Sequence, residues 1–328
     1  STNRCGMAYQ TSLRERLESD EIIVAPGIHD SLTARAAEIV GGFDALYMTG
    51  HGTSLSTTGY PDAGLVTMTE EVRNARNVQE TTSIPVIADA DTGYGNATNV
   101  IRTVREFSRT GVAAIQIEDQ VEPKRCGHVG GRRIVSEEEA AGKYRAAAET
   151  RDKRNEDMLI VARTDARGAV GGSLDKAIDR MHTYLEAGAD VAFVESPASV
   201  EELERIGEEI DAPLLYNCVG ISPKVEPEKL EAMGFDIVIY PIATTRAAIA
   251  ASIEHLEDIK ERGTAAEEDM DERFDDLPFD TEFEDKALRK FFEFGNFPQI
   301  YDWEDDYLPE EEKEKYEGTL GENISGGD

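Results

Sequence analysis

The sequence predicts an α/β fold, a (β/α)8 barrel of the TIM type, and three observations support this. Near-continuous apolar runs rich in β-branched residues recur along residues 1–262, as in parallel strands that are covered on both faces. Amphipathic helical stretches separate these runs, and eight such units in about 260 residues match the barrel. Most of the runs end in a polar or charged residue, and a barrel collects such ends on one catalytic face. An open doubly wound sheet is the alternative, and it would spread them along a crevice.

The predicted strands span residues 22–25, 45–49, 86–89, 113–118, 159–163, 191–195, 214–217 and 237–240. Helices are expected between them, because residues 69–71, 136–139 and 199–202 place Ser or Thr ahead of acidic residues, a helix-start signal. Glycines are expected to end several helices before the next strand, at Gly41, Gly111, Gly188 and Gly234. The polar residues at the strand ends are Thr49, Asp89, Glu118, Arg163, Glu195 and Asn217.

The composition changes after residue 262, which predicts a catalytic barrel over residues 1–262 and an acidic C-terminal extension over residues 263–328. Residues 264–285 are dense in Asp and Glu with little periodicity, and residues 287–297 resemble a short amphipathic helix. The charged residues 310–328 are expected to fray. Aromatic residues such as Trp303 and Tyr307 suggest that the extension docks onto the barrel or onto a neighbouring subunit, and a solvated tail is the alternative.

The formal net charge is −33, from 67 acidic and 34 basic residues. This charge repels phosphates and anionic membranes, so neither nucleic acid nor a membrane is an expected partner. A disordered acidic interaction protein would lack the regular apolar runs. The sequence therefore indicates a folded enzyme from a halophile, with an acidic surface whose self-repulsion is screened by high salt.

A cytoplasmic location is expected. No apolar segment reaches the roughly 18–20 residues that span a bilayer, and the N-terminus lacks a basic region followed by an apolar core. The three cysteines, Cys5, Cys126 and Cys218, are scattered and odd in number, which argues against a disulfide framework and for a reducing compartment.

Four carboxylates predict a site for a divalent metal ion. Asp89 and Asp91 lie two residues apart and so share a face of an extended segment, Glu118 ends the next strand, and Asp62 follows the second strand. Hard oxygen ligands favour Mg²⁺ or Mn²⁺. Helix capping or pairing with arginine is the alternative use of these acids.

A cysteine among cations is the second predicted chemical group. Cys126 stands between Lys124-Arg125 and His128, in a stretch with several glycines. Nearby cations lower the pKa of a thiol towards physiological pH, which would suit a general acid or base. A buried structural cysteine is the alternative, but such cysteines usually lie in apolar runs.

Two arginines that follow apolar strands, Arg163 and Arg246, are expected to bind carboxylate, since bidentate pairing is the natural use of a guanidinium there. For Arg163, pairing with Glu195 or Asp165 is the alternative. His29 and His51 follow the first two strands and are expected to face the site. Together these groups predict a small polyanionic carboxylate as the substrate, chelated by a metal ion.

These residues resemble the isocitrate lyase/phosphoenolpyruvate mutase superfamily over roughly residues 15–260. Residues 124–128, Lys-Arg-Cys-Gly-His, resemble the signature of the lyase branch, which comprises isocitrate lyases and 2-methylisocitrate lyases, whereas mutases lack the cysteine. Residues 60–62, 89–95, 117–120 and 162–166 also match in order.

The resemblance implies a barrel with a C-terminal helix that swaps between subunits, usually of a homotetramer. It implies Mg²⁺ held by Asp89 and Asp91, with Asp62 and Glu118 nearby, mostly through water. The implied catalytic residues are Cys126, Lys124, His128 and Glu118. The implied substrate-binding residues are Tyr47, Thr49, Gly50, His51, Gly127, Arg163, Glu195, Asn217 and Arg246.

The implied reaction is a retro-aldol cleavage. A base removes the proton of the 2-hydroxyl group, the C–C bond breaks to give glyoxylate or pyruvate, and Cys126 protonates the carboxylate-stabilised carbanion that leaves. Isocitrate, cleaved to glyoxylate and succinate in the glyoxylate cycle, is the first expectation, since residues 216–218 with Ser222-Pro223 resemble a stretch of isocitrate lyases. The alternatives are 2-methylisocitrate, another 2-alkylmalate, and oxaloacetate hydrolysis on the same scaffold.

Overall fold

The computed structural model describes residues 12–19, 21–154, 157–281 and 289–313. The chain forms two compact units, Ser1–Ala247 and Ala248–Asp328. The predicted boundary after residue 262 coincides with the end of helix α10 (Ala243–Arg262), whereas the two units divide inside that helix. Cys5, residues 287–288 of the predicted short helix and residues 314–328 of the predicted frayed tail lie outside the described residues.

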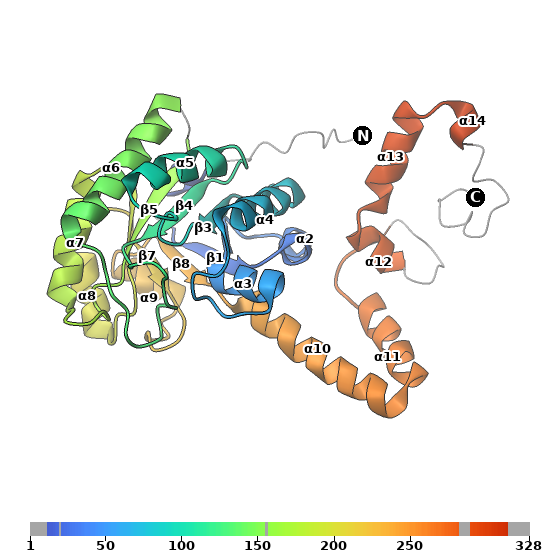
Figure 1. The fold of residues 1–328 in the computed structure, drawn as a ribbon. Coiled ribbons are helices and arrows are strands. Elements are labelled where there is room, and N and C mark those ends of the chain that lie inside the picture. Colours follow the sequence, from blue (N-terminus) through green and yellow to red (C-terminus); the bar gives the residue numbers. More distant parts are fainter. Residues whose placement is uncertain (1–11, 20, 155–156, 282–288, 314–328) are drawn as a thin grey trace. The chain divides into compact units, whose positions relative to one another are not determined.

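Eight parallel strands form the barrel that the sequence predicts (Figure 1). The sheet order is β6-β5-β4-β3-β2-β1-β8-β7, and a parallel bridge between Ala192 and Leu214 joins the two outer strands. This bridge distinguishes a barrel from an open sheet. The strands are β1 (Ile23–Ile28), β2 (Leu46–Met48), β3 (Val86–Asp89), β4 (Ala114–Glu118), β5 (Leu159–Thr164), β6 (Val191–Val194), β7 (Leu215–Asn217) and β8 (Ile237–Tyr240).

Helices alternate with these strands and cover the outside of the barrel (Figure 1). Helix α4 begins before the predicted Thr69, because Thr67 is the N-cap and forms a capping box with Glu70. Ser199 caps α8 as predicted. The helices of the first unit that precede α10 are α1 (Leu13–Arg16), α2 (Ser31–Val40), α3 (Gly50–Thr58), α4 (Met68–Thr81), α5 (Ala97–Ser108), α6 (Glu137–Arg154), α7 (Leu174–Glu186), α8 (Val200–Glu209) and α9 (Pro227–Ala232).

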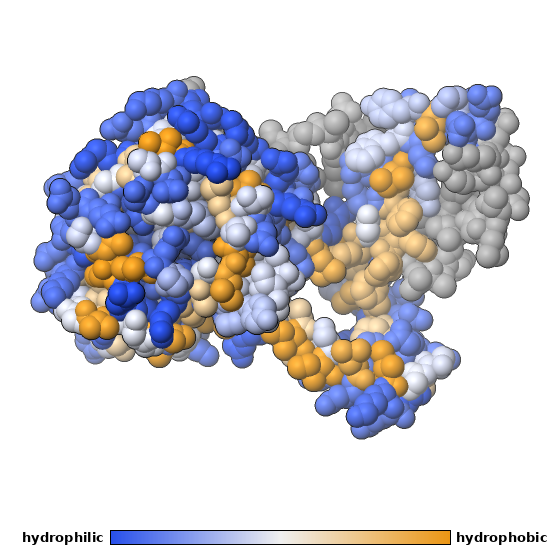
Figure 2. Space-filling view, viewed as in Figure 1, coloured by the Kyte–Doolittle hydropathy of each residue, from blue (hydrophilic) through white to orange (hydrophobic). Residues whose placement is uncertain are grey.

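The core of the barrel has two apolar layers, because successive strand residues point to opposite faces. Ile87 belongs to the inner layer, while its neighbours Val86 and Ala88 pack outward with Val72 and Ala75 of α4. The outward surface in Figure 2 is largely hydrophilic. None of the helices in the described part of the chain has the length and apolar character that crossing a bilayer requires.

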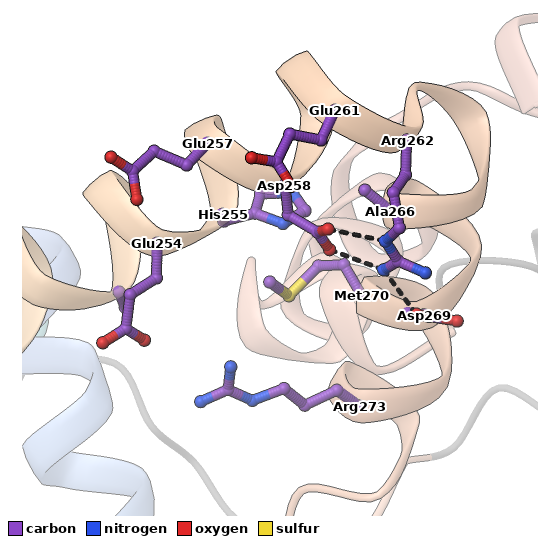
Figure 3. Close-up of a pocket in the computed structure, with 11 residues that line it drawn as sticks. Glu254, His255, Glu257, Asp258, Glu261, Arg262, Ala266, Asp269, Met270 and Arg273 are labelled. Atoms are coloured by element: carbon purple, nitrogen blue, oxygen red, sulfur yellow. Dashed lines mark hydrogen bonds and ion pairs between the residues drawn. The ribbon is translucent and has the colours of Figure 1, made fainter.

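The second unit contains most of α10 together with α11 (Thr264–Asp275), α12 (Arg289–Phe294), α13 (Phe297–Tyr307) and α14 (Glu310–Lys313). Residues 264–275 are helical despite their weak periodicity, because Ala, Glu and Met favour helix. Arg262 of α10 binds Asp258 and, at 2.6 Å, Asp269 of α11 (Figure 3). These charged side chains line a pocket of about 440 Å³ between the two helices.

Candidate active site

The C-terminal ends of the strands bring the predicted polar residues to one face of the barrel. Asp89 and Glu118 are the last residues of β3 and β4, and Glu195 directly follows β6. The strand register sets Asp89 beside Gln116 and Glu118 beside Arg163. Parallel strands of a barrel end on the same face, so these side chains belong to one site.

The turn after β3 holds the two aspartates in an unusual backbone conformation. Asp91 has a φ of +48°, in the left-handed region that few residues other than glycine adopt. Asp89 Oδ1 accepts hydrogen bonds from the Asp91 backbone nitrogen at 3.0 Å and from Gln116 Nε2 at 3.3 Å. Gly50 leaves space for Asp89, because a Cβ at position 50 would lie 2.6 Å from Oδ2. Strain of this kind persists where the surroundings fix the geometry, often at functional sites.

Lys124 connects the Cys126 loop, which we define as residues 121–133, to two of the predicted metal ligands. Its buried Nζ lies 2.9 Å from Asp62 Oδ1 and also contacts Asp91 Oδ1. Burial alone would lower the Lys124 pKa, but the carboxylates of Asp62 and Asp91 hold it well above its usual value. The ammonium group is therefore charged and partly neutralises the acids around it.

Glu118 is fully buried and lies close to Arg163. Neither Oε1 nor Oε2 has a hydrogen-bond partner among the described residues, although Arg163 Nη1 lies 3.4 Å from Oε2. Burial raises the Glu118 pKa well above the ordinary carboxyl range, and Arg163 and Lys124 oppose this shift. Burial likewise raises the pKa of Asp91, to about 7, although Lys124 opposes it.

The four carboxylates suit Mg²⁺ by donor type and by charge. In the described ranges, no three His, Cys, Asp or Glu side chains are placed to hold an ion directly. Mg²⁺ commonly keeps several waters and takes only one or two protein carboxylates, so a direct three-ligand cage is not required. The Glu118 oxygens without hydrogen-bond partners among the described residues and the raised Asp91 pKa indicate that Lys124 and Arg163 do not fully offset the negative charge of the site. A hard divalent ion bound partly through water would supply further positive charge.

Besides Glu118, Arg163 contacts two acidic residues beneath the Cys126 loop, Asp165 and Glu195. Its Nε and Nη2 donate to the two oxygens of Asp165 at 3.0 and 3.2 Å, and Nη2 lies 3.3 Å from Glu195 Oε2. Asn217 Nδ2 donates to the same Glu195 oxygen at 3.2 Å. The alternative pairing of Arg163 with Asp165 and Glu195 is therefore present, and it fixes the guanidinium at the site.

The Cys126 loop is anchored at its base and near its tip. A bridge between Gln120 and Ile134 closes the base, and Arg132 binds the buried Asp165 at 2.7 Å. Near the tip, Gly127 lies against Arg163 and Glu195 so closely that a Cβ would meet both side chains. His128 Nε2 is 3.5 Å from Glu195 Oε1. The loop thus packs onto the site that the strand ends form.

The predicted lowering of the Cys126 pKa is wrong. Burial raises the pKa of this half-buried thiol above its ordinary value; the backbone of His128 and the charge of Arg163 oppose the shift, and Asp62 and Glu195 add to it. The cations beside Cys126 in sequence point elsewhere: Lys124 binds Asp62 and Asp91, and the exposed Arg125 donates to the Gly130 carbonyl at 3.3 Å. A thiol that keeps its proton suits a general acid better than a base.

The remaining predicted residues differ in their placement. Tyr47 is buried and donates to Gln116 Oε1 at 2.7 Å, with Asp89 Oδ2 at 3.5 Å. Thr49 is the N-cap of α3, and His51 in its first turn has a buried Nδ1 to which no residue in the described part of the chain hydrogen-bonds. Arg246 is exposed in the first turn of α10. Among the described residues, no hydrogen bond or ion pair joins Arg246 to the other predicted residues.

His29, which is expected to face the site, contacts Asp30 and the start of α10, with its Nε2 3.7 Å from Asp30 Oδ2. Its Nδ1 lies 3.1 Å from Thr244 Oγ1 and 3.2 Å from Thr245 Oγ1, so the imidazole ring is within hydrogen-bond distance of the first turn of α10.

Three buried polar residues at the site were not predicted. Gln116 interrupts the apolar run of β4, and that interruption was a usable signal. Glu71 shares a helical face with Val72, Ala75 and Val78, so its periodicity could have revealed burial. For Ser196, no comparable feature of the sequence indicates that its side chain is buried at the site.

Comparisons with known proteins agree with this geometry. A family model described as phosphoenolpyruvate phosphomutase matches residues 13–260. The chain is 50% identical over 264 residues to the 2,3-dimethylmalate lyase of Eubacterium barkeri, covering 79% of this chain and 89% of that protein. It is 44% identical over 254 residues to the 2-methylisocitrate lyase of Aeropyrum pernix, covering 77% and 80%. It is 37% identical over 314 residues to the isocitrate lyase of Haloferax volcanii, covering 88% and 90%.

Solved structures agree as well. A 2,3-dimethylmalate lyase, described as a PEP mutase/isocitrate lyase superfamily member, aligns with a TM-score of 0.82 and 35% identity over 95% of this chain and 98% of that one. A phosphonopyruvate hydrolase in complex with oxalate and Mg²⁺ aligns with a TM-score of 0.75 and 30% identity over 90% and 98%.

Proposed function

The chain belongs to the phosphoenolpyruvate mutase/isocitrate lyase superfamily, in which it is a carbon–carbon lyase, and from this premise we propose its reaction. The substrate is a 2-hydroxycarboxylate of the malate type with a methyl group on the hydroxyl-bearing carbon. Cleavage of its C–C bond releases pyruvate. The observation that carries the proposal is the half-buried Cys126 thiol, whose pKa burial raises, on a loop packed over Arg163 and Glu195.

The protein residues divide the chemistry between two sides of the substrate. On one side, a basic group of the site takes the proton of the 2-hydroxyl group, the oxygen forms the carbonyl of the oxo-acid, and the C–C bond breaks, which leaves its electron pair on a carboxylate-stabilised carbanion. On the other side, the Cys126 thiol gives its proton to that carbanion. Packing of the Cys126 loop over the site excludes water, which would otherwise quench the intermediate.

A divalent ion, Mg²⁺ or alternatively Mn²⁺, completes this proposal. Asp89 and Asp91 would hold it, with Asp62 and Glu118 nearby, and when bound it would stabilise the negative charge that develops on the substrate oxygen. The Mg²⁺ complex of the similar phosphonopyruvate hydrolase supports this choice.

Two relatives support a methyl-substituted substrate. The chain shares 50% and 44% identity with a 2,3-dimethylmalate lyase and a 2-methylisocitrate lyase, against 37% with an isocitrate lyase. Isocitrate remains the second candidate for a specific reason. The alignment with the Haloferax volcanii isocitrate lyase covers 88% of this chain, against 79% and 77% for the other two.

We further propose a cytoplasmic homotetramer from a halophile, in which the C-terminal helix swaps between subunits. Ile249, Ile253 and Leu256 support the swap, because they lie on one side of α10 and are 48%, 55% and 64% exposed. The net charge of −33 supports the halophilic origin.

The experiment identifies the oxo-acid that is released. The chain is incubated with Mg²⁺ in molar KCl with 2,3-dimethylmalate, 2-methylisocitrate or isocitrate, and the hydrazone of the product distinguishes pyruvate from glyoxylate. Pyruvate from a methyl-substituted substrate supports the proposal, and glyoxylate from isocitrate alone replaces it with the second candidate.

Cys126→Ser tests the acid role. The variant should lose at least about 10²-fold in kcat, within the usual contribution of general acid catalysis. Cys218→Ser is the matched control, since Cys218 is also a half-buried free cysteine, and it should keep wild-type activity. Normal turnover by folded Cys126→Ser would show that another group protonates the carbanion.

A further inference from the structure

Ser196 bridges the Cys126 loop and a carboxylate of the site. It directly follows Glu195 after β6 and is 1% exposed. Its Oγ lies 2.8 Å from the Gly127 carbonyl oxygen and 3.0 Å from Glu195 Oε1. We propose that Ser196 is a positioning residue that couples the seating of the Cys126 loop to the hydrogen bonding of Glu195. This inference rests on the proposed function.

The coupling follows from the single proton of a hydroxyl group. The Gly127 carbonyl oxygen and Glu195 Oε1 both lie within hydrogen-bond distance of the one Ser196 hydroxyl proton, so Ser196 can make a full hydrogen bond to only one of them at a time. When the loop is seated, the Ser196 hydroxyl donates its hydrogen bond to the Gly127 carbonyl oxygen, and Glu195 Oε1 becomes available to His128 Nε2, 3.5 Å away. When the loop leaves, the hydroxyl turns to Glu195.

The surroundings of Gly127 make this contact specific. Because Gly127 lacks a side chain, the loop backbone can approach Arg163 and Glu195, and a Cβ would lie 2.8 Å from Glu195 Cγ. Lys124 and Arg132 anchor the loop through other acids, Asp62, Asp91 and Asp165. Ser196 instead binds the residue next to Cys126, so it controls where the thiol sits.

The backbone conformation of Ser196 also supports a specific role for its side chain. Its φ is +60°, in the left-handed region that glycine adopts without steric cost and serine rarely does. If the backbone were the only requirement, glycine would serve at least as well. The buried hydroxyl, with two partners from different parts of the site, gives a reason for serine.

The test compares Ser196→Ala and Ser196→Gly with the wild-type chain by two readouts. The first is the rate at which iodoacetamide alkylates Cys126, followed by peptide mass spectrometry with Cys218 as the internal standard. Loss of the anchor should raise this rate roughly two- to tenfold in both variants, as expected for one net hydrogen bond. The second is lyase turnover, in which kcat should fall by a similar factor with little change in KM.

The outcomes separate the coupling from other roles. Wild-type alkylation and turnover in Ser196→Gly would overturn the proposal, since only the backbone would then matter. A fall in turnover without faster alkylation would also overturn it. Faster alkylation of the variants, in a protein whose wild type cleaves none of the three substrates, would support the loop contact while the proposed function fails.

Discussion

At the scale of the residue, Glu71 shows how the site affects the stability of the fold. It lies on the buried side of α4, 1% exposed, and its Oε2 has no hydrogen-bond partner within the described ranges of the chain. Burial raises the pKa of Glu71 well above the ordinary carboxyl range; Asp91 and Asp89 add to this shift and Lys124 opposes it. The folded protein therefore binds the Glu71 proton more tightly than the unfolded chain does.

This difference predicts the pH dependence of Glu71→Gln. The stability due to the raised pKa is present below the unfolded value of about 4.3 and is lost as pH rises through the folded pKa. As pH rises above the unfolded value, the free energy of unfolding of the wild type should fall relative to Glu71→Gln until the folded pKa is passed. The change should be roughly 1–3 kcal/mol, the usual penalty for an unpartnered buried polar group.

Urea unfolding at constant KCl and without metal measures this difference. Glu80→Gln is the matched control, because Glu80 is exposed on the same helix, and it should leave the curve unchanged. Parallel pH curves for the wild type and Glu71→Gln would contradict the prediction.

The polar residues at the strand ends could be predicted, but the direction in which the Cys126 pKa shifts could not. Asp89 and Glu118 end strands where expected, because a run of apolar residues shows where a strand stops. The neighbours of Cys126 misled the prediction, since Lys124 is two residues away in sequence yet binds Asp62 and Asp91. The left-handed φ of Ser196 was also beyond prediction, because sequence propensity disfavours it.

At the scale of the element, the Cys126 loop depends on close packing at one glycine. A Cβ at Gly127 would meet Arg163 and Glu195, whereas a Cβ at Gly130 has nothing within 4 Å. Gly127→Ala should therefore lift the loop and lower kcat/KM by roughly 10²-fold, as displacements of about 1 Å can do. Gly130→Ala should keep wild-type kcat/KM.

Steady-state kinetics with the best substrate compares the two variants, and circular dichroism checks that both are folded. Equal activity of Gly127→Ala and the wild type would mean that the loop need not approach Arg163 and Glu195 during turnover. Equal losses in both variants would point to loop flexibility rather than close packing.

The elements of the barrel were largely predictable because periodicity and capping agree along them. Each predicted strand overlaps an observed one, and Ser199 caps α8 as expected. The second unit was harder, since α11 forms from residues with weak periodicity whose ion pairs depend on α10. Such pairs are visible only once both helices are placed.

At the scale of the whole molecule, the net charge of −33 sets how the fold responds to salt. Self-repulsion of an acidic surface weakens when the Debye length shortens, from about 10 Å at 0.1 M to about 3 Å at 1 M. The melting temperature should therefore rise as KCl increases from about 0.2 to 3 M. Thermal unfolding followed by circular dichroism measures it.

A double variant of two exposed glutamates tests whether repulsion between acidic side chains causes this salt dependence. Glu204 and Glu208 lie four residues apart on the outside of α8, where like charges repel by roughly 0.2–0.5 kcal/mol. Replacing both by glutamine should stabilise the protein at low salt and have no effect in molar KCl. A melting temperature that falls with KCl would contradict the halophilic interpretation.

Where β6 meets β7, Glu195 and Asn217 have a structural role in addition to the substrate-binding role proposed for them. The backbone connects these strands through the Ala192–Leu214 bridge, and just beyond it the Asn217 amide reaches across to Glu195. The barrel is thus closed partly by a hydrogen bond between side chains that are also predicted to bind the substrate. Impaired catalysis after substitution of Asn217 or Glu195 could then come from a lost substrate contact or from weaker closure of the barrel, so a measurement of stability is needed beside the rate.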